Sequence, residues 1–233
     1  MILQTLNRLA GVALDQLYPP QCALCEKHGP FLCDACRAAL PRAEGPRCDV
    51  CWLPSGVSPC ATCAAFPPAL TSLRSVFRYE GKVRELVHAF KFGRMSVLGR
   101  PLAAQLAGCY RLHSPDADVI VPVPLSTSRK RDRGFNQAEL MAREVARDAG
   151  VPWMAALERR GHSRSQASSS SAEQRRLNVE GVFRTATGVD VSGLRVLLID
   201  DVATTGSTLN ACAALLLAAG AGEVSGLTLA RED

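Results

Sequence analysis

The stretch VLLIDDVATTGSTL, residues 196–209, decides the fold of this chain. Four apolar residues lead into two adjacent carboxylates, Asp200 and Asp201, and a loop of small and hydroxyl-bearing residues follows. Like charges side by side at the end of a buried strand cost desolvation and repulsion unless a cation or a hydroxyl-rich group binds there. The stretch therefore predicts a buried strand, a ligand-binding turn and a helix over about 207–219.

The loop after the two carboxylates has the groups of a phosphate cradle. It offers backbone N–H groups, a flexible glycine and several hydroxyls, and it opens a helix whose N-terminal dipole favours an anion. Two carboxylates would repel a phosphate bound beside them. They are therefore expected to face a neutral polyol such as a ribose, or to share a divalent cation with the phosphates. The candidate binding residues are Asp200, Asp201, Ala203, Thr204, Thr205, Gly206, Ser207 and Thr208.

Strand-like and helix-like patterns alternate through the chain from about residue 67 onward. Such alternation predicts an α/β fold, a parallel sheet with helices on both faces, and ligands of these sheets bind at the carboxyl ends of strands. The expected strands are 75–79, 118–124, 153–157, 195–199 and 223–231, and the expected helices are 82–92, 99–110, 136–149 and 207–219.

Eight of the ten cysteines form four C-x-x-C pairs, a spacing that favours metal binding over disulfides. Eight thiolates predict two zinc ions, and full ligation by four sulfurs makes both sites structural. Intervals of seven and eight residues favour sequential sites, while a crossed arrangement of the pairs and iron–sulfur ligation stay open as alternatives. The sequential sites are Cys22, Cys25, Cys33 and Cys36, then Cys48, Cys51, Cys60 and Cys63.

Composition places the chain among globular proteins of one or two domains. It has 233 residues, of which 47% are hydrophobic, and a formal charge of +5 that decides neither for nucleic acid nor for small anionic substrates. Residues 1–17 are expected to form an amphipathic helix, and no stretch approaches the ~20 apolar residues of a membrane span. We therefore expect a cytoplasmic protein, with zinc ribbons over 1–66 and an α/β domain over 67–233, divided near two prolines.

The acidic strand end and its loop resemble the 5-phosphoribosyl-1-pyrophosphate (PRPP) motif of type I phosphoribosyltransferases. Neither a Walker A loop nor a Rossmann G-x-G-x-x-G fingerprint is present. Together with VPVPLSTSRKRDRGFNQAELMA at 121–142, FKF at 90–92 and the four cysteine pairs, the chain resembles the ComF (competence protein F) family over nearly its whole length. That resemblance implies a double zinc ribbon, a phosphoribosyltransferase domain and a role in DNA uptake.

The same resemblance implies a role for each part of the site. Asp200 and Asp201 would hold the ribose 2′- and 3′-hydroxyls and favour the positive charge that develops on the ring, and residues 204–208 would hold the 5-phosphate. Mg²⁺ would bridge pyrophosphate and ribose, and an acceptor nitrogen of unknown identity would attack C1. The cations that could neutralise pyrophosphate, or grip nucleic-acid phosphates, are Arg129, Lys130, Arg131 and Arg133.

The segment 159–183 occupies the place of the mobile catalytic loop in this family. Serines at Ser163 and over 168–171 depart from the expected pattern, whereas other family positions are matched. The sequence is equally compatible with two positions of the Lys91 side chain within FKF. It could extend from a helix face to water, or it could face a ligand. The matched positions are Gln166, Arg175, Asn178 and Phe183.

Two functions of different classes follow from these observations. One is an enzyme that binds PRPP and Mg²⁺ and transfers the phosphoribosyl group. The other is a non-catalytic DNA-uptake protein that binds single-stranded DNA or a helicase-like partner. The ribbon region carries few cations and one exposed-looking aromatic residue for base stacking, Trp52, so protein contact is expected there and DNA contact at the basic loop 129–133.

Overall fold

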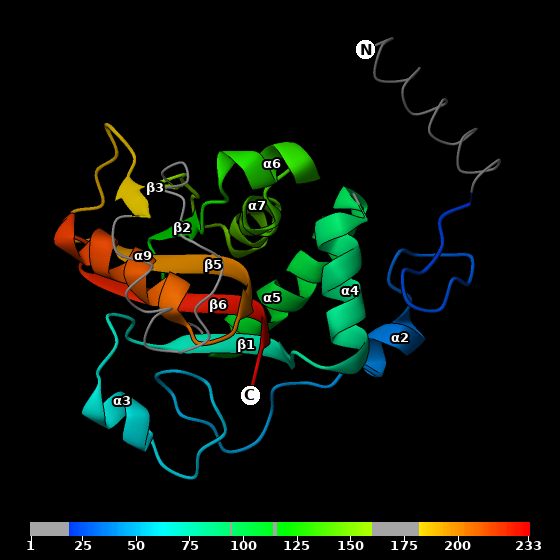
Figure 1. The fold of residues 1–233 in the computed structure, drawn as a ribbon, viewed down its shortest axis with the longest axis horizontal. Coiled ribbons are helices and arrows are strands. Elements are labelled where there is room, and N and C mark those ends of the chain that lie inside the picture. Colours follow the sequence, from blue (N-terminus) through cyan, green and yellow to red (C-terminus); the bar gives the residue numbers. More distant parts are fainter. Residues whose placement is uncertain (1–18, 94, 114–115, 160–181) are drawn as a thin grey trace. The chain divides into compact units, whose positions relative to one another are not determined.

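The computed structural model describes residues 19–93, 95–113, 116–159 and 182–233 (Figure 1). The chain divides into two compact units, residues 1–40 and 41–233. The domain boundary predicted near residue 66 stays a prediction and falls within the second unit, which also holds the second group of cysteines. The amphipathic helix expected over 1–17 lies outside the described residues. Among the helices that are described, none is long and apolar enough to cross a membrane.

The second unit is built on a sheet of four parallel strands, in agreement with the predicted fold class. Their order is β1-β6-β5-β2, and a separate antiparallel pair joins β3 to β4 (Figure 1). The bounds are β1 (Leu73–Arg78), β2 (Val119–Pro122), β3 (Leu157–Arg159), β4 (Phe183–Thr185), β5 (Arg195–Ala203) and β6 (Glu223–Arg231).

Helices cover both faces of this sheet. Helices α5 and α7 pack against one face, α5 on β1 and β6 and α7 on β5 and β2, whereas α9 packs on β5 and β6 from the opposite face (Figure 1). The long helices are α4 (Gly81–Phe92), α5 (Gly99–His113), α7 (Gln137–Ala149) and α9 (Ser207–Ala218). The short ones are α2 (Asp34–Ala38), α3 (Ala61–Ala65), η1 (Ser96–Leu98) and α6 (Thr127–Arg133).

Local signals in the sequence fix where α7 begins and ends. The side chain of Asn136 accepts a hydrogen bond from the backbone N–H of Ala138 at 3.1 Å, and Gly150 ends the helix in the left-handed conformation. The strand expected over 153–157 is wrong, because Trp153 forms only an isolated bridge to β2 and β3 begins at Leu157.

The basic loop expected at 129–133 is also wrong, since these residues form most of the short helix α6. Ser126 caps the helix by accepting from the N–H of Arg129 at 3.4 Å, and Gly134, with φ of 83°, ends it. A serine before a run of long side chains and a glycine after it are start and stop signals that outweigh the charge of the run.

Trp52 is buried and therefore no platform for base stacking, contrary to the expectation from sequence. Only 9% of its surface is exposed, and its indole N–H donates to the carbonyl of Ser75 on β1 at 3.1 Å. The guanidinium of Arg74 lies 4.5 Å from the indole centre, and the ring of His113 meets it edge-on. Trp52 follows a cysteine knuckle with a φ of 61°, and in this turn its ring packs onto β1.

Ion pairs also attach the second cysteine segment to the sheet. Arg47 donates to both carboxylate oxygens of Asp233, at 2.7 and 3.0 Å, and to the carbonyl of Trp52 at 2.7 Å. Arg74 of β1 pairs with Asp49 at 3.3 Å. The second cysteine group is therefore packed against β1 and the end of β6 within one compact unit.

Replacing Trp52 is expected to destabilise the second unit in two separable steps. Trp52→Phe keeps most of the packing but leaves the Ser75 carbonyl without its donor, which costs about 1–2 kcal/mol. Trp52→Ala also leaves a cavity, and the total loss should be about 3–5 kcal/mol. Urea denaturation followed by circular dichroism measures both. An alanine variant as stable as the wild type would contradict the placement of Trp52 in the core.

Candidate functional site

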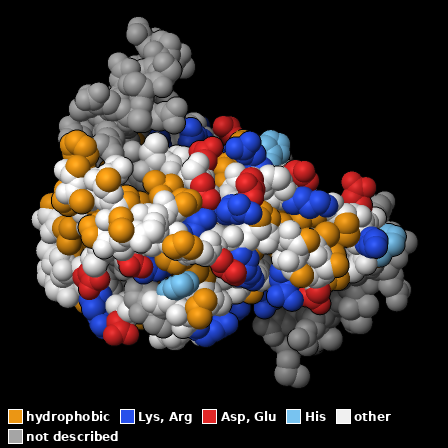
Figure 2. All heavy atoms as spheres, turned by 90° about the horizontal axis from the view of Figure 1, so that it is seen from below, with side chains coloured by type: hydrophobic (Ala, Val, Ile, Leu, Met, Phe, Trp, Pro, Cys, Tyr) orange, Lys and Arg blue, Asp and Glu red, His pale blue; other side chains and the backbone are white. Residues whose placement is uncertain are grey.

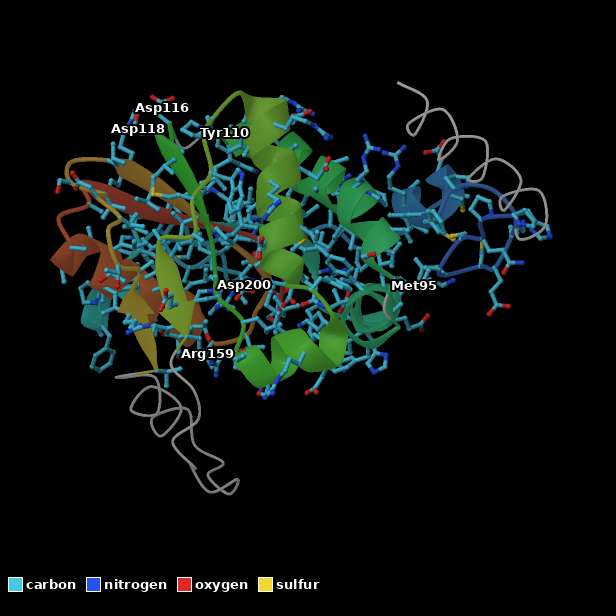
Figure 3. The ribbon with its side chains drawn as sticks, turned by 90° about the horizontal axis from the view of Figure 1, so that it is seen from above. Met95, Tyr110, Asp116, Asp118, Arg159 and Asp200 are labelled. Carbon is cyan, nitrogen blue, oxygen red and sulfur yellow. The ribbon has the colours of Figure 1, made fainter. Side chains whose placement is uncertain are left out.

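The acid pair lies where β5 extends beyond its neighbour β2. Pro122, the last residue of β2, pairs with Ile199, so Asp200 and Asp201 follow beyond that point at the carboxyl end of the sheet. Figure 3 shows Asp200 at the end of the sheet opposite to Asp118, which precedes β2. The strand end predicted from the sequence is thus open on one side.

The two carboxylates are electrostatically unequal. Burial, together with the charge of Asp201, raises the pKa of Asp200 to about 7, although Lys91 and Arg159 oppose the shift. One oxygen of Asp200 also accepts from the backbone N–H of Asp201 at 2.8 Å. A carboxylate with a pKa this high is incompletely compensated, and a cation or a donor-rich ligand would stabilise its charged form.

Lys91 faces this pair, so its side chain does not extend to water, and contact with a ligand stays a prediction. Its ammonium group lies 2.7 Å from an oxygen of Asp201, and both side chains are largely buried. Helix α4 brings it there because its apolar face, which adjoins Lys91, is completely buried and fixes the rotation of the helix. The buried residues are Val83, Leu86, Val87 and Phe90.

Arg159, at the end of β3, is a further cation that the sequence reasoning did not single out. It lies at the same end of the sheet as Asp200 in Figure 3, and the charges of Asp200 and Arg159 act on one another. Burial lowers its pKa. The sequence contained one indication of this role: Arg159 is the first residue of the segment 159–183, which occupies the position of the mobile catalytic loop in the family.

The four cations of α6 divide into two groups. Arg133 is half-buried beside the acid pair, where burial lowers its pKa and Asp201 opposes that shift. Arg129 is exposed but close enough to repel both Arg133 and Arg159. Lys130 instead pairs with Glu139 at 3.5 Å, and Arg131 is exposed.

The loop after β5 has the geometry of an anion-binding helix start. Gly206, with φ of 77°, precedes α9 and carries no side-chain cap. The N–H of Ser207 donates to the Thr205 hydroxyl at 3.3 Å, and the following N–H groups of the first turn point toward a ligand position. The hydroxyls of Thr205 and Ser207 lie 2.7 Å apart. Thr204 and Thr205 are exposed, whereas Ala203 is buried and continues β5, so its side chain contributes to the core instead.

Lys91, Arg133 and Arg159 thus lie at the two carboxylates beside this loop, and Arg129 lies near the two arginines. Four cations against two acids leave room for an anionic ligand, and the acids can accept from hydroxyls. The predicted positions Ser163, Gln166, Arg175 and Asn178 lie outside the described residues, while Phe183 is buried in β4.

The cysteines form two groups, and the pairing is sequential, not crossed. Within each group the four sulfurs lie within 4.8 Å of one another. One group lies in each compact unit. The groups are Cys22, Cys25, Cys33 and Cys36, and Cys48, Cys51, Cys60 and Cys63.

Both groups fit a zinc ion. The sulfurs of Cys25 and Cys33 lie 3.8 Å apart, as do those of Cys51 and Cys60. This is the edge of a tetrahedron with Zn–S bonds of about 2.3 Å, whereas a cluster of several irons would hold the sulfurs farther apart.

The protonation of the thiols also fits a metal. Burial opposes ionisation of Cys22 and Cys48, but neighbouring backbone N–H groups outweigh it and lower the pKa of each thiol to about 6. Hydrogen bonds to Cys25 and Cys33 raise the pKa of Cys36 to about 12. A cation among the thiols would favour ionisation of all four, and the sulfur spacing fits two structural zinc centres.

Known families match both parts of the chain. Residues 13–66 match the double zinc ribbon domain family and residues 114–232 the phosphoribosyl transferase domain family. The chain is 35% identical to the DNA utilization protein YhgH of Salmonella typhi over 207 residues, which is 86% of this chain and 90% of the relative. It is 32% identical to the competence protein ComFC of Bacillus subtilis over 209 residues, covering 86% and 84% of the two chains.

Among solved structures, the chain is similar to the glutamine PRPP amidotransferase from B. subtilis, with 24% identity and a TM-score of 0.40 over 58% of this chain and 26% of the other. The sequence relatives establish the family, because the chain matches them over most of their length. With its double zinc ribbon ahead of a phosphoribosyl transferase domain, the chain belongs to the ComF family of competence proteins.

Proposed function

We propose that this protein binds PRPP together with Mg²⁺ at the carboxyl end of β5, and that it acts in DNA uptake. One observation carries the first part: Asp200 and Asp201 adjoin a hydroxyl-rich helix start and face the cations of α4, α6 and β3. PRPP combines a terminal phosphate, a ribose and a pyrophosphate, so its three parts correspond to the loop, the acid pair and the cations.

Each part of the ligand has residues of matching chemistry. Asp200 and Asp201 accept hydrogen bonds from the 2′- and 3′-hydroxyls of the ribose, and residues 204–208 donate N–H and O–H groups to the 5-phosphate. Arg129, Arg133 and Lys91 face the pyrophosphate. Mg²⁺, when bound with the ligand, would neutralise pyrophosphate charge and improve it as a leaving group.

Transfer of the phosphoribosyl group is the reaction that this arrangement favours. The bond from C1 to the pyrophosphate oxygen breaks, pyrophosphate leaves with both electrons, and a nitrogen of the acceptor forms the new bond to C1 and gives its proton to water. Asp200 and Asp201 stabilise the positive charge on the ring, while the nearby arginines stabilise the leaving group. An amine or a nucleobase is the acceptor class.

The names of the relatives support the second part of the proposal. YhgH is named a DNA utilization protein and ComFC a competence protein. Cysteine groups that require reduced thiols support a place in the cytoplasm.

A second candidate function, binding of single-stranded DNA without catalysis, has one favourable observation. Arg129, Lys130 and Arg131 are exposed on α6. The face in Figure 2 supports no equivalent site, because Lys and Arg side chains alternate there with Asp and Glu among its coloured atoms. A helicase-like protein partner stays a prediction for the ribbon.

Removing the charge of the acid pair should abolish PRPP binding. The double variant Asp200→Asn, Asp201→Asn keeps side-chain size but loses the strong acceptors for the ribose hydroxyls. Calorimetry with PRPP and MgCl₂ should show binding to the wild type and a loss of at least about 100-fold in the variant, by about 1.5–3 kcal/mol for each charged hydrogen bond. Zinc content and circular dichroism serve as controls. Unchanged affinity in a folded, zinc-loaded variant would contradict the site.

Binding should depend on the ionisation of Asp200. Because its pKa is raised to about 7 and the ribose needs an ionised acceptor, affinity should rise with pH up to about 7 and level off above it. In Lys91→Met the charge that opposes this shift is gone, so the midpoint should move to higher pH. The phosphate groups of PRPP titrate in the same way with the wild type and with Lys91→Met, so they do not contribute to the difference between the two midpoints. Calorimetry from pH 5.5 to 8.5 measures the midpoints, and identical midpoints would argue against the role of Asp200.

Two arginines of α6 should separate PRPP binding from DNA binding. Arg133→Ala removes a cation beside the acid pair and should weaken PRPP binding by about tenfold or more. Arg131→Ala, on the exposed part of the helix, should leave PRPP binding unchanged but reduce the slope of log K against log salt for an oligo(dT) probe by about 0.7. Fluorescence anisotropy at 50 to 200 mM NaCl measures the slope. Oligonucleotide binding that is independent of salt and of Arg131 would exclude α6 as the DNA contact.

A further inference from the structure

Arg231 connects the sheet to the loop that begins α9. It is the last residue of β6, only 2% of its surface is exposed, and its guanidinium Nη1 donates to the backbone carbonyl of Thr204. Its own backbone is held on both sides, by pairing with Ala203 of β5 and by accepting from the N–H of Tyr79 at 2.7 Å. A buried arginine thus fixes the first residue of the phosphate-binding loop.

The second cysteine group lies beside the same arginine. The thiols of Cys51 and Cys63 interact electrostatically with Arg231. All three line one cavity of about 400 Å³, whose wall also includes Thr205 and Ser207 of the loop. The zinc-binding side of the ribbon and the phosphate-binding loop therefore face a common hollow on either side of Arg231.

The charge of Arg231 requires a partner in this place. Its Nε is buried and has no hydrogen-bond acceptor among the residues that the structure describes. Arg47, also buried, lies near it and is paired with Asp233, whose carboxylate acts on Arg231 as well. One carboxylate leaves one of the two guanidinium charges without a counter-charge, and four thiolates around one Zn²⁺, with a net charge of about −2, would supply it.

We propose that zinc in the second centre holds Arg231 in place and, through its hydrogen bond to Thr204, keeps the loop 204–207 in its ligand-binding conformation. Arg231 is then a positioning residue, and the second centre is part of the phosphate site. The first centre belongs to the other compact unit, residues 1–40, and is assigned no such role. The part of the inference that concerns PRPP rests on the proposed function, whereas the effect of Arg231 on zinc binding does not.

Matched cysteine variants test the difference between the two centres. Cys33 and Cys60 each precede a five-residue helix, α2 and α3, at the same place in their groups. Cys60→Ser should weaken binding of PRPP with MgCl₂ by about tenfold or more, the effect of losing a residue that orients a ligand-binding group. Cys33→Ser should bind within about twofold of the wild type. Equal affinity of the two folded variants overturns the inference.

Variants of Arg231 test the same link if Cys60→Ser does not fold. Arg231→Met removes the charge and the donor, and Arg231→Lys restores the charge alone. In a Cys33→Ser background, where only the second centre binds zinc, competition with a chromogenic chelator should show about tenfold weaker zinc binding for Arg231→Met and recovery for Arg231→Lys. Neither variant should recover full PRPP affinity, because methionine has no donor and lysine lacks the planar guanidinium whose Nη1 donates to the Thr204 carbonyl.

Arg47→Met is the control for general destabilisation. Arg47 is buried in the same region, but its guanidinium donates to Trp52 and Asp233 and not to the loop. Arg47→Met should lower the unfolding midpoint in urea and leave PRPP affinity within about twofold of the wild type. Arg231→Met should lower PRPP affinity even when zinc fully occupies the second centre. Loss of affinity in proportion to stability for both variants overturns a positioning role.

Failure of the inference is distinguishable from failure of the proposed function. If the wild type does not bind PRPP, the proposed function fails, and the link is judged by zinc affinity alone. Zinc binding of the second centre that is unaffected by Arg231→Met then overturns the link as well. If the wild type binds PRPP and Cys60→Ser, folded and without zinc in its second centre, binds it equally, the proposed function stands and the inference falls.

Discussion

The ion pair between Lys91 and Asp201, 2.7 Å long and largely buried, is the interaction on which the site depends. Two adjacent carboxylates at the end of a buried strand repel one another, and burial adds a desolvation cost. The lysine offsets part of that cost and leaves Asp200 with a raised pKa. The site is therefore assembled but electrostatically incomplete, a state in which a ligand that brings hydroxyls and a cation gains more than it would in water.

Packing far from the carboxylates makes this ion pair possible. Lys91 reaches the acid pair only because the apolar face of α4 is buried, and Arg133 reaches it because Ser126 and Gly134 confine α6 to seven residues. The helix start at Gly206 is fixed from the other side, by a hydrogen bond that Arg231 gives to the preceding loop. Three elements that are distant in sequence thus meet at one strand end.

Sequence predicted the features that depend on local spacing. The cysteine pairs, the cap at Asn136 and the acidic strand end all lie within short stretches whose chemistry is complete in itself. Trp52, by contrast, looked exposed because its burial depends on β1, to which it is joined only in the folded chain. Arg231 gave no signal, since an arginine at the end of a strand is ordinarily solvated and only the neighbouring thiols and loop make it unusual.

The spacing of cations on α6 suits two anionic ligands at once. Arg129 and Arg133 are four residues apart and therefore share a helix face, and the charges of both act at the acid pair or at its neighbour Arg159. Arg131 lies two residues from each and so faces elsewhere, toward solvent. A nucleic-acid backbone at Arg131 would lie on the opposite side of α6 from Arg129 and Arg133 and would not compete for these two cations. PRPP binding at Arg129 and Arg133 would then be compatible with DNA contact at Arg131, because the helical period places them on opposite faces, whereas DNA contact that also used Arg129 would compete with PRPP.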